Sequence, residues 1–126
     1  MSTHNPVHDC YQAAISYPDL VNRLIAIGVE SYTVDVSSSI MLYRFAEGKI
    51  VLHQDNTPSK SIAASFDEQK TIEAVRNTQQ GKTDYPTFVN EIAAAGVRFY
   101  EAILTGANKR VMYIGIGGYY EESIPL

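Results

Sequence analysis

The sequence repeats itself at a distance of 68 residues, and this repeat constrains the fold more than any other feature. Residues 17–32 (YPDLVNRLIAIGVESY) and 85–100 (YPTFVNEIAAAGVRFY) are identical at eight of sixteen positions. Unrelated segments would share about one, given the ~7% usage of even the common residues. Self-similarity at a fixed distance is the signature of a repeated structural unit. We therefore expect one domain over residues 1–126 that contains two internal repeats, about 4–55 and 62–126.

Each repeat contains a helix with clear start signals. Pro18 and Pro86 fit the first helical turn, where the backbone N–H makes no intrahelical hydrogen bond. Ser16 and Asp84 precede these prolines and can cap the exposed N–H groups of the turn. Apolar residues then recur three and four positions apart, as on the buried face of a helix.

Both helices end at a glycine. Gly28 and Gly96 can adopt the left-handed backbone conformation that closes a helix. A β-branched residue resists that conformation. We therefore expect Gly28→Val and Gly96→Val to destabilise the fold strongly and alike.

The segments after these glycines have the pattern of strands. Apolar and polar residues alternate over 32–37 and 100–105, which is typical of a strand that buries one face. Tyr43 of the first repeat then matches Tyr113 of the second after a two-residue insertion. Glycine-containing turns predict two hairpins. Their strands are expected over residues 40–45, 49–53, 110–116 and 119–123.

A further helix is expected before each of the repeated helices. In the first repeat it covers about residues 6–14. In the second, Ser65 and Glu68 form a capping-box pattern and Gly81 ends the helix. Residues 56–60 form a polar connector between the repeats.

The expected unit is therefore α-α-β-β-β, used twice. A unit of about 60 residues is marginally stable alone, and a three-stranded sheet leaves an edge or a face exposed. Two units related by a pseudo-two-fold axis can join their edges or stack their faces. We expect an α+β fold with one continuous antiparallel sheet and the helices packed on one face.

The residues also resemble a known family. The segment 66–86 (FDEQKTIEAVRNTQQGKTDYP), the following Tyr-Pro-Thr-Phe and Ala-Ala-Gly-Val, the triplet 104–106 and the run 111–118 are similar to the YbcV-like family. This family comprises uncharacterised bacterial proteins that are often labelled phage envelope proteins. The resemblance covers nearly the whole chain. Because its motifs belong to the scaffold, it implies a fold family and no catalytic or binding residues.

Charge and composition exclude several classes of function. The chain has 10 Lys and Arg against 14 Asp and Glu, a net charge of −4, which disfavours binding to nucleic acid phosphates. It contains no apolar run of about 18 residues, so no membrane-spanning helix is expected. The N-terminal residues do not form a secretory signal, and Cys10 is the single cysteine. These observations predict a cytoplasmic protein.

Histidine and cysteine offer weak candidates for chemistry. His4 and His8 are four residues apart, but Pro6 between them places His4 before the helix. A structural zinc ion needs about four ligands. Cys10 could act as a nucleophile with His53 only if folding brings the two together. We therefore expect no metal, no cofactor and no catalytic residue from this set.

Tyrosine is the unusual residue, with nine copies and no tryptophan. Tyr32, Tyr43, Tyr100 and Tyr113 fall on expected strands in matched pairs. One interpretation is cross-strand packing, since strands favour aromatic residues. The other is a functional surface, either an aromatic-walled cleft that binds a small-molecule ligand or an interface between two copies of the chain in a homodimer.

These features favour a non-catalytic binding or interaction module that self-associates. The alternative is an enzyme that acts on a small substrate in a cleft between the repeats, with acid–base groups drawn from the strand carboxylates. Those carboxylates are Asp35, Glu101, Glu121 and Glu122. A second alternative, which rests only on the family label, is a phage-related structural component.

Overall fold

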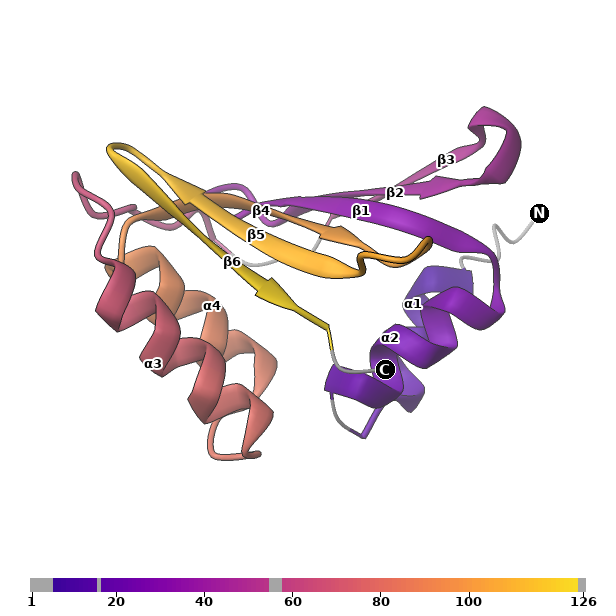
Figure 1. The fold of residues 1–126 in the computed structure, drawn as a ribbon, viewed down its shortest axis with the longest axis horizontal. Helices are drawn as coiled ribbons and strands as arrows, with labels where there is room; N and C mark the ends of the chain where they lie inside the picture. Colours follow the sequence, from indigo (N-terminus) through magenta and orange to yellow (C-terminus); the bar gives the residue numbers. More distant parts are fainter. Residues whose placement is uncertain (1–5, 16, 55–57, 125–126) are drawn as a thin grey trace.

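The computed structural model describes residues 6–15, 17–54 and 58–124. These residues form four α-helices and one six-stranded antiparallel sheet, so the predicted α+β class is confirmed (Figure 1). The first half of the chain contains α1 (Pro6–Ala13), α2 (Tyr17–Ala26), β1 (Val29–Asp35), β2 (Ile40–Phe45), a short 3-10 turn (Ala46–Gly48) and β3 (Ile50–Gln54). The second half contains α3 (Glu68–Gln79), α4 (Tyr85–Ala94), β4 (Val97–Ile103), β5 (Arg110–Gly115) and β6 (Gly118–Ser123).

The sheet runs without interruption through both halves of the chain. Its strand order is β3-β2-β1-β4-β5-β6, and β1 and β4 join the halves at the centre. Thr33 pairs with Glu101 across this junction. All four helices lie on the same face of the sheet, with α1 and α2 forming one pair and α3 and α4 the other (Figure 1). The expectation of one continuous sheet with helices on one face is thus confirmed.

The start of α4 follows its sequence signals, whereas the start of α3 does not. Asp84 caps α4, because its Oδ1 accepts a hydrogen bond from the Thr87 amide at 2.9 Å. The capping box expected at Ser65 is wrong: Asp67 caps α3 and accepts from the Lys70 amide at 3.0 Å. The reason is tertiary, since the backbone just before α3 is hydrogen-bonded to other elements. The counterpart expected at Ser16 lies outside the described residues.

Gly28 and Gly96 both have positive φ, at 98° and 86°, as the helix-end signals require. Their surroundings differ, so the structure gives a reason to expect that substitutions at the two positions act differently and not alike. A Cβ on Gly28 would meet only the Phe45 ring, at 3.7 Å, whereas one on Gly96 would lie 2.3 Å from the Ser65 carbonyl oxygen. Only the second glycine allows a close approach of two backbone segments.

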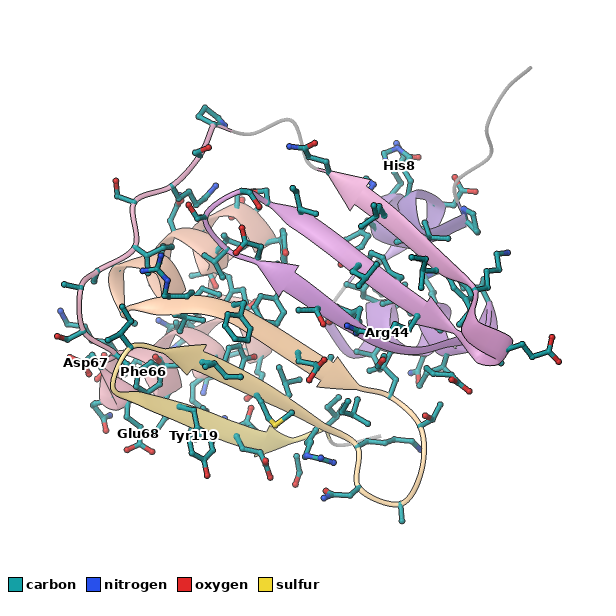
Figure 2. The ribbon with its side chains drawn as sticks, turned by 90° about the horizontal axis from the view of Figure 1, so that it is seen from above. His8, Arg44, Phe66, Asp67, Glu68 and Tyr119 are labelled. Atoms are coloured by element: carbon teal, nitrogen blue, oxygen red, sulfur yellow. The ribbon has the colours of Figure 1, made fainter. Side chains whose placement is uncertain are left out.

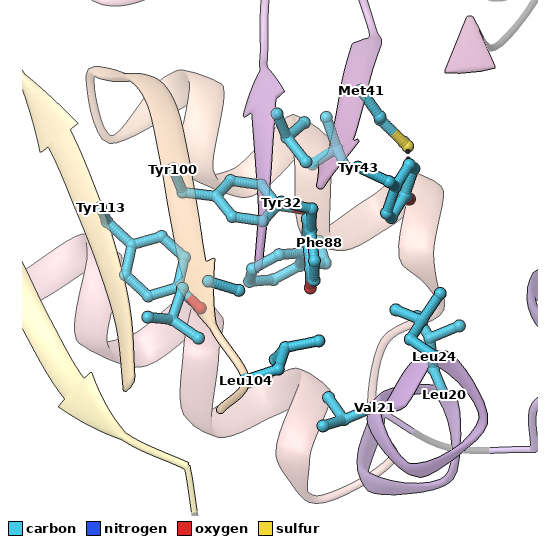
Figure 3. Close-up of a cluster of buried hydrophobic side chains, with 14 of the residues drawn as sticks. Leu20, Val21, Leu24, Tyr32, Met41, Tyr43, Phe88, Tyr100, Leu104 and Tyr113 are labelled. Carbon is cyan, nitrogen blue, oxygen red and sulfur yellow. Dashed lines mark hydrogen bonds between the residues drawn. The ribbon is translucent and has the colours of Figure 1, made fainter. Parts of the chain in front are cut away.

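One hydrophobic core fills the space between the sheet and the helices, and both halves of the chain contribute to it. Tyr32, Tyr43, Leu24, Ile92 and Leu104 are among its largest fully buried side chains. The close-up in Figure 3 shows tyrosines of the strands and leucine and valine side chains of α2, which belong to this core. None of the helices in the described part of the chain has the length and apolar character needed to cross a membrane.

Candidate functional site

A cleft of about 590 Å³ lies between the two helix pairs, and the sheet forms its floor. This volume is within the range of about 300–1,000 Å³ that is typical of small-molecule sites. Both halves of the chain contribute to the walls. The first half supplies Tyr11, Ala14, Ile15, Leu20 and Tyr32, and the second half supplies the other residues, from α3, α4, β4, β5, β6 and their connections.

A smaller hollow of about 350 Å³ lies at the end of β1. Its carboxylate, Asp35, already accepts hydrogen bonds from the amide and hydroxyl of Ser38 within the β1–β2 turn. The carboxylate of this hollow therefore serves the turn itself. The larger cleft is the better candidate site.

Aromatic rings dominate the walls of the larger cleft. Tyr11 on α1 and Tyr85 on α4 connect the two helix pairs, with ring centroids 6.0 Å apart in an edge-to-face arrangement. On the floor, Tyr100 lies 6.4 Å from Tyr32 and 5.5 Å from Tyr113. Phe88 on α4 supplies the sixth ring, which lies 6.4 Å from that of Tyr100 (Figure 3). Such a wall suits a ligand with flat or apolar surfaces.

The four tyrosines singled out in the sequence all face the helices. Tyr32, Tyr43, Tyr100 and Tyr113 are 1%, 0%, 3% and 5% exposed. Three of them line the cleft, and Tyr43 does not. Tyr43 lies behind Tyr11 and donates a hydrogen bond from its hydroxyl to the Tyr11 hydroxyl. The fold thus brings these rings together from both halves of the chain.

Hydrogen bonds between hydroxyls support the aromatic wall. The hydroxyl groups of Tyr85 and Tyr100 lie 3.0 Å apart. Burial, followed by the neighbouring tyrosines, raises the pKa of Tyr100 well above its ordinary value of 10. The Tyr100 side chain is therefore neutral throughout the physiological range.

Thr83, in the connection before α4, places a polar group in this apolar setting. Its side-chain oxygen is buried and lines the cleft. Among the residues that the structure describes, none forms a hydrogen bond with Thr83 Oγ1. A buried hydroxyl without a partner costs about 1–3 kcal/mol, and a bound ligand could supply the missing hydrogen bond.

Two carboxylates line the cleft. Glu122 on β6 accepts hydrogen bonds from Gln79 Nε2 at 2.7 Å and from the Tyr120 hydroxyl at 2.9 Å, and it also binds Arg76. The same carboxylate raises the pKa of Arg76. Asp84 is the cap of α4 described above, and hydrogen bonds from Thr87 lower its pKa.

The carboxylates proposed from the sequence as acid–base groups are not brought together. Glu122 faces the cleft, whereas Asp35, Glu101 and Glu121 lie on the opposite, uncovered face of the sheet. There Glu101 accepts a hydrogen bond from Thr33 Oγ1 at 3.1 Å and lies 3.5 Å from Arg44. This set does not form one acid–base centre.

Among the described residues, no histidine or cysteine lines the cleft. Cys10 is 6% exposed, and burial raises the pKa of its thiol, which lowers its reactivity. The ring of His53 lies 5.7 Å from that of His8 and 6.2 Å from that of Tyr11. His4 lies outside the described residues. Within the described ranges, no three His, Cys, Asp or Glu side chains are grouped so that they could hold a metal ion.

Several cleft residues were not singled out in the sequence, namely Tyr11, Thr83, Tyr85 and Phe88. Tyr85 and Phe88 are three residues apart on α4, so helical spacing places them on one face. That pattern also describes an ordinary core helix. Tyr11 and Thr83 had no local signal, because only the packing of the two helix pairs makes them neighbours of the cleft.

Comparison with known proteins supplies a family. A family model described as "Protein of unknown function (DUF1398)" matches residues 5–118. No curated protein matches the chain. Because the match covers most of the chain, the protein belongs to the DUF1398 family.

Proposed function

We propose that this protein is a non-catalytic binding module that holds a small, largely apolar molecule in the cleft between its helix pairs. The observation that carries the proposal is the unpartnered hydroxyl of Thr83 inside an aromatic cleft. A few placed polar groups in a mostly apolar pocket are typical of ligand sites. The aromatic rings would supply contact area, and Thr83 would orient the ligand.

The pKa values of the cleft wall support binding over acid–base catalysis. Burial holds Tyr100 protonated, and hydrogen bonds from the Thr87 side chain and amide hold Asp84 ionised. Both shifts move the groups further from titration near neutral pH. A general acid or base works best when its pKa is close to the operating pH.

The replacement Thr83→Val tests the proposal because valine keeps the shape and removes the hydroxyl. We expect the wild-type protein to bind 2-naphthol about 2–10-fold more tightly than naphthalene, since only 2-naphthol can bond to Thr83. Thr83→Val should abolish this preference. It should also raise the melting temperature by about 3–6 °C, because an unpaired buried group is lost. NMR titration and thermal melting measure the two effects.

The exposed neighbour Lys82, replaced by alanine, is the matched control and should change neither quantity. Absence of binding by both probes would contradict the proposal. A melting temperature that falls in Thr83→Val would show that the hydroxyl serves the fold instead.

The uncovered face of the sheet favours a second function, self-association into a homodimer. Strand alternation and register place nine apolar side chains on this face. They are Ile40, Leu42, Ile50, Leu52, Phe99, Ile103, Met112, Ile114 and Tyr119. Leu52 is 65% exposed and Tyr119 is 64% exposed. Figure 2 shows this face from above, with Tyr119 near one edge.

Charge and area support a second copy of the chain as the occupant. Arg44 lies 3.5 Å from Glu101, and Arg110 lies 3.6 Å from Glu121, so these four charges pair within the face, and Asp35 at the end of β1 is bound by Ser38. A surface of this kind attracts no strongly charged partner and is compatible with its own copy. Six strands of about six residues cover roughly 600 Å² in projection. Because side chains project from the sheet, the accessible surface of this face is larger than its projected area and approaches the ~800 Å² per partner that a stable interface buries.

Light scattering after gel filtration, at tens of micromolar, tests the homodimer. We expect twice the mass of one chain for the wild type and for Ala94→Lys, which adds a lysine on the exposed side of α4. Leu52→Lys should give the mass of one chain, because it places a charge in the apolar interface. A monomeric wild type would contradict self-association, and larger particles would favour the phage-related structural role.

A further inference from the structure

We propose that the cleft selects organic cations, that is, aromatic or alkyl ammonium compounds, over anions of the same shape. This inference rests on the proposed binding function and adds the charge class of the ligand. It depends on three features of the cleft: its aromatic rings, its carboxylates, and the state of the α4 N-terminus.

The rings are the first feature. Six aromatic side chains line the cleft, and a seventh, Tyr43, lies directly behind Tyr11. The faces of aromatic rings carry negative partial charge and attract cations, more strongly where water is excluded. Tyr32, Tyr100 and Tyr113 are nearly fully buried in this wall. The floor of the cleft is thus built from aromatic rings, which favour a positive group.

The charged residues are the second feature. Of the nineteen residues that line the cleft in the described part of the chain, two are acidic, Asp84 and Glu122, and none is basic. The basic group bound to this wall is Arg76, whose side chain is 46% exposed and is held by Glu122. Arg76 offsets the charge of Glu122, and the charge of Asp84 remains. The cleft therefore has a net negative wall.

The N-terminus of α4 is the third feature, because a helix N-terminus in a cleft would ordinarily attract an anion. Here Asp84 already occupies that position. Its carboxylate accepts a hydrogen bond from the Thr87 amide at 2.9 Å. The N-terminus of α4 thus already binds a carboxylate of the protein, so it does not favour an anionic ligand.

Three naphthalene probes of similar size test the inference: trimethyl(2-naphthyl)ammonium, neutral 2-naphthol, and naphthalene-2-sulfonate. We expect the ammonium compound to bind at least about tenfold more tightly than the sulfonate. Isothermal titration calorimetry on the full chain measures the three dissociation constants. Binding of 2-naphthol tests the proposed function, and the ratio between the two ions tests the charge preference.

Variants locate the preference in the cleft. Asp84→Asn retains a capping side chain, and Glu122→Gln retains the shape. Each should lower the ammonium-to-sulfonate preference by at least about threefold. Glu121→Gln removes the same charge from the neighbouring residue of β6, on the opposite face of the sheet, and should leave the preference unchanged.

Two results would overturn the inference while the binding function stands. One is 2-naphthol binding with equal affinities for the two ions. The other is a preference that Glu121→Gln reduces as much as Asp84→Asn, which would assign it to the overall charge of −4. If none of the three probes binds, the binding function and the charge preference both fail.

Discussion

Gly96→Ala should lower the free energy of unfolding by about 4 kcal/mol, which is a large fraction of the 5–15 kcal/mol of a typical domain. Alanine at a positive φ costs about 1–2 kcal/mol. The added methyl group would also lie 2.3 Å from Ser65 O and 2.9 Å from Phe66 Cα, which are backbone atoms. Overpacking of this kind costs a further 1–3 kcal/mol or more.

The overlap cannot be relieved cheaply, because the opposing segment is held on both sides. The Phe66 amide donates to the Ile116 carbonyl at 3.0 Å, and the Asp67 amide donates to the Ala95 carbonyl at 2.7 Å. Moving Ser65 away from residue 96 would stretch these hydrogen bonds and disturb the cap of α3. We therefore expect the melting temperature to fall by more than about 10 °C.

Gly28→Ala is the matched control, since it introduces the same residue at the same kind of helix end. Its Cβ would meet only a side-chain atom of Phe45, at 3.7 Å. The expected loss in the free energy of unfolding is therefore only that of placing alanine at a positive φ, about 1–2 kcal/mol. Chemical denaturation of both variants measures the difference. Equal losses would show that the overlap between an added methyl group at residue 96 and the Ser65 backbone does not lower stability.

The fold could be predicted from the sequence to the extent that its signals are local. Proline and aspartate at the start of α4, glycine after its last turn and the alternation along β1 and β4 each act within a few residues. These signals predicted the order of helices and strands. They did not predict that β1 and β4 would be the joining strands, because strand pairing is decided by long-range contacts.

The error at α3 has the same origin. Ser65 and Asp67 are both good capping residues, two positions apart, and local preference does not separate them. The choice falls on Asp67 because tertiary hydrogen bonds hold the amides of Phe66 and Asp67 before the helix, where Asp67 has extended backbone. The capping-box pattern at residues 65–68 carries no information about these tertiary hydrogen bonds.

The candidate site was predictable only in part. The tyrosines of the strands were visible as matched pairs, because β-strand alternation places them on one face. The cleft itself depends on how far apart the two helix pairs lie, and this distance has no counterpart in a sequence pattern. Thr83 illustrates the limit: its chemical interest comes from burial without a partner, which is a property of the packed structure.

Tyr32→Ala is the second substitution for which we expect a large effect, a loss of about 3–5 kcal/mol in the free energy of unfolding. Tyr32 is 1% exposed at the centre of the sheet, and its ring lies 5.2 Å from that of Tyr43 and 6.4 Å from that of Tyr100. Its removal would leave a hole between rings from both halves of the chain. Thermal and chemical denaturation measure the loss.

Two further variants separate the contribution of the ring from other effects. Tyr32→Phe keeps the ring and should lose no more than about 1.5 kcal/mol. Ile116→Ala removes an apolar side chain that is 58% exposed between β5 and β6, and it should change stability by no more than about 0.5 kcal/mol. If Tyr32→Ala were as stable as Ile116→Ala, packing would not explain the burial of the tyrosines between the sheet and the helices.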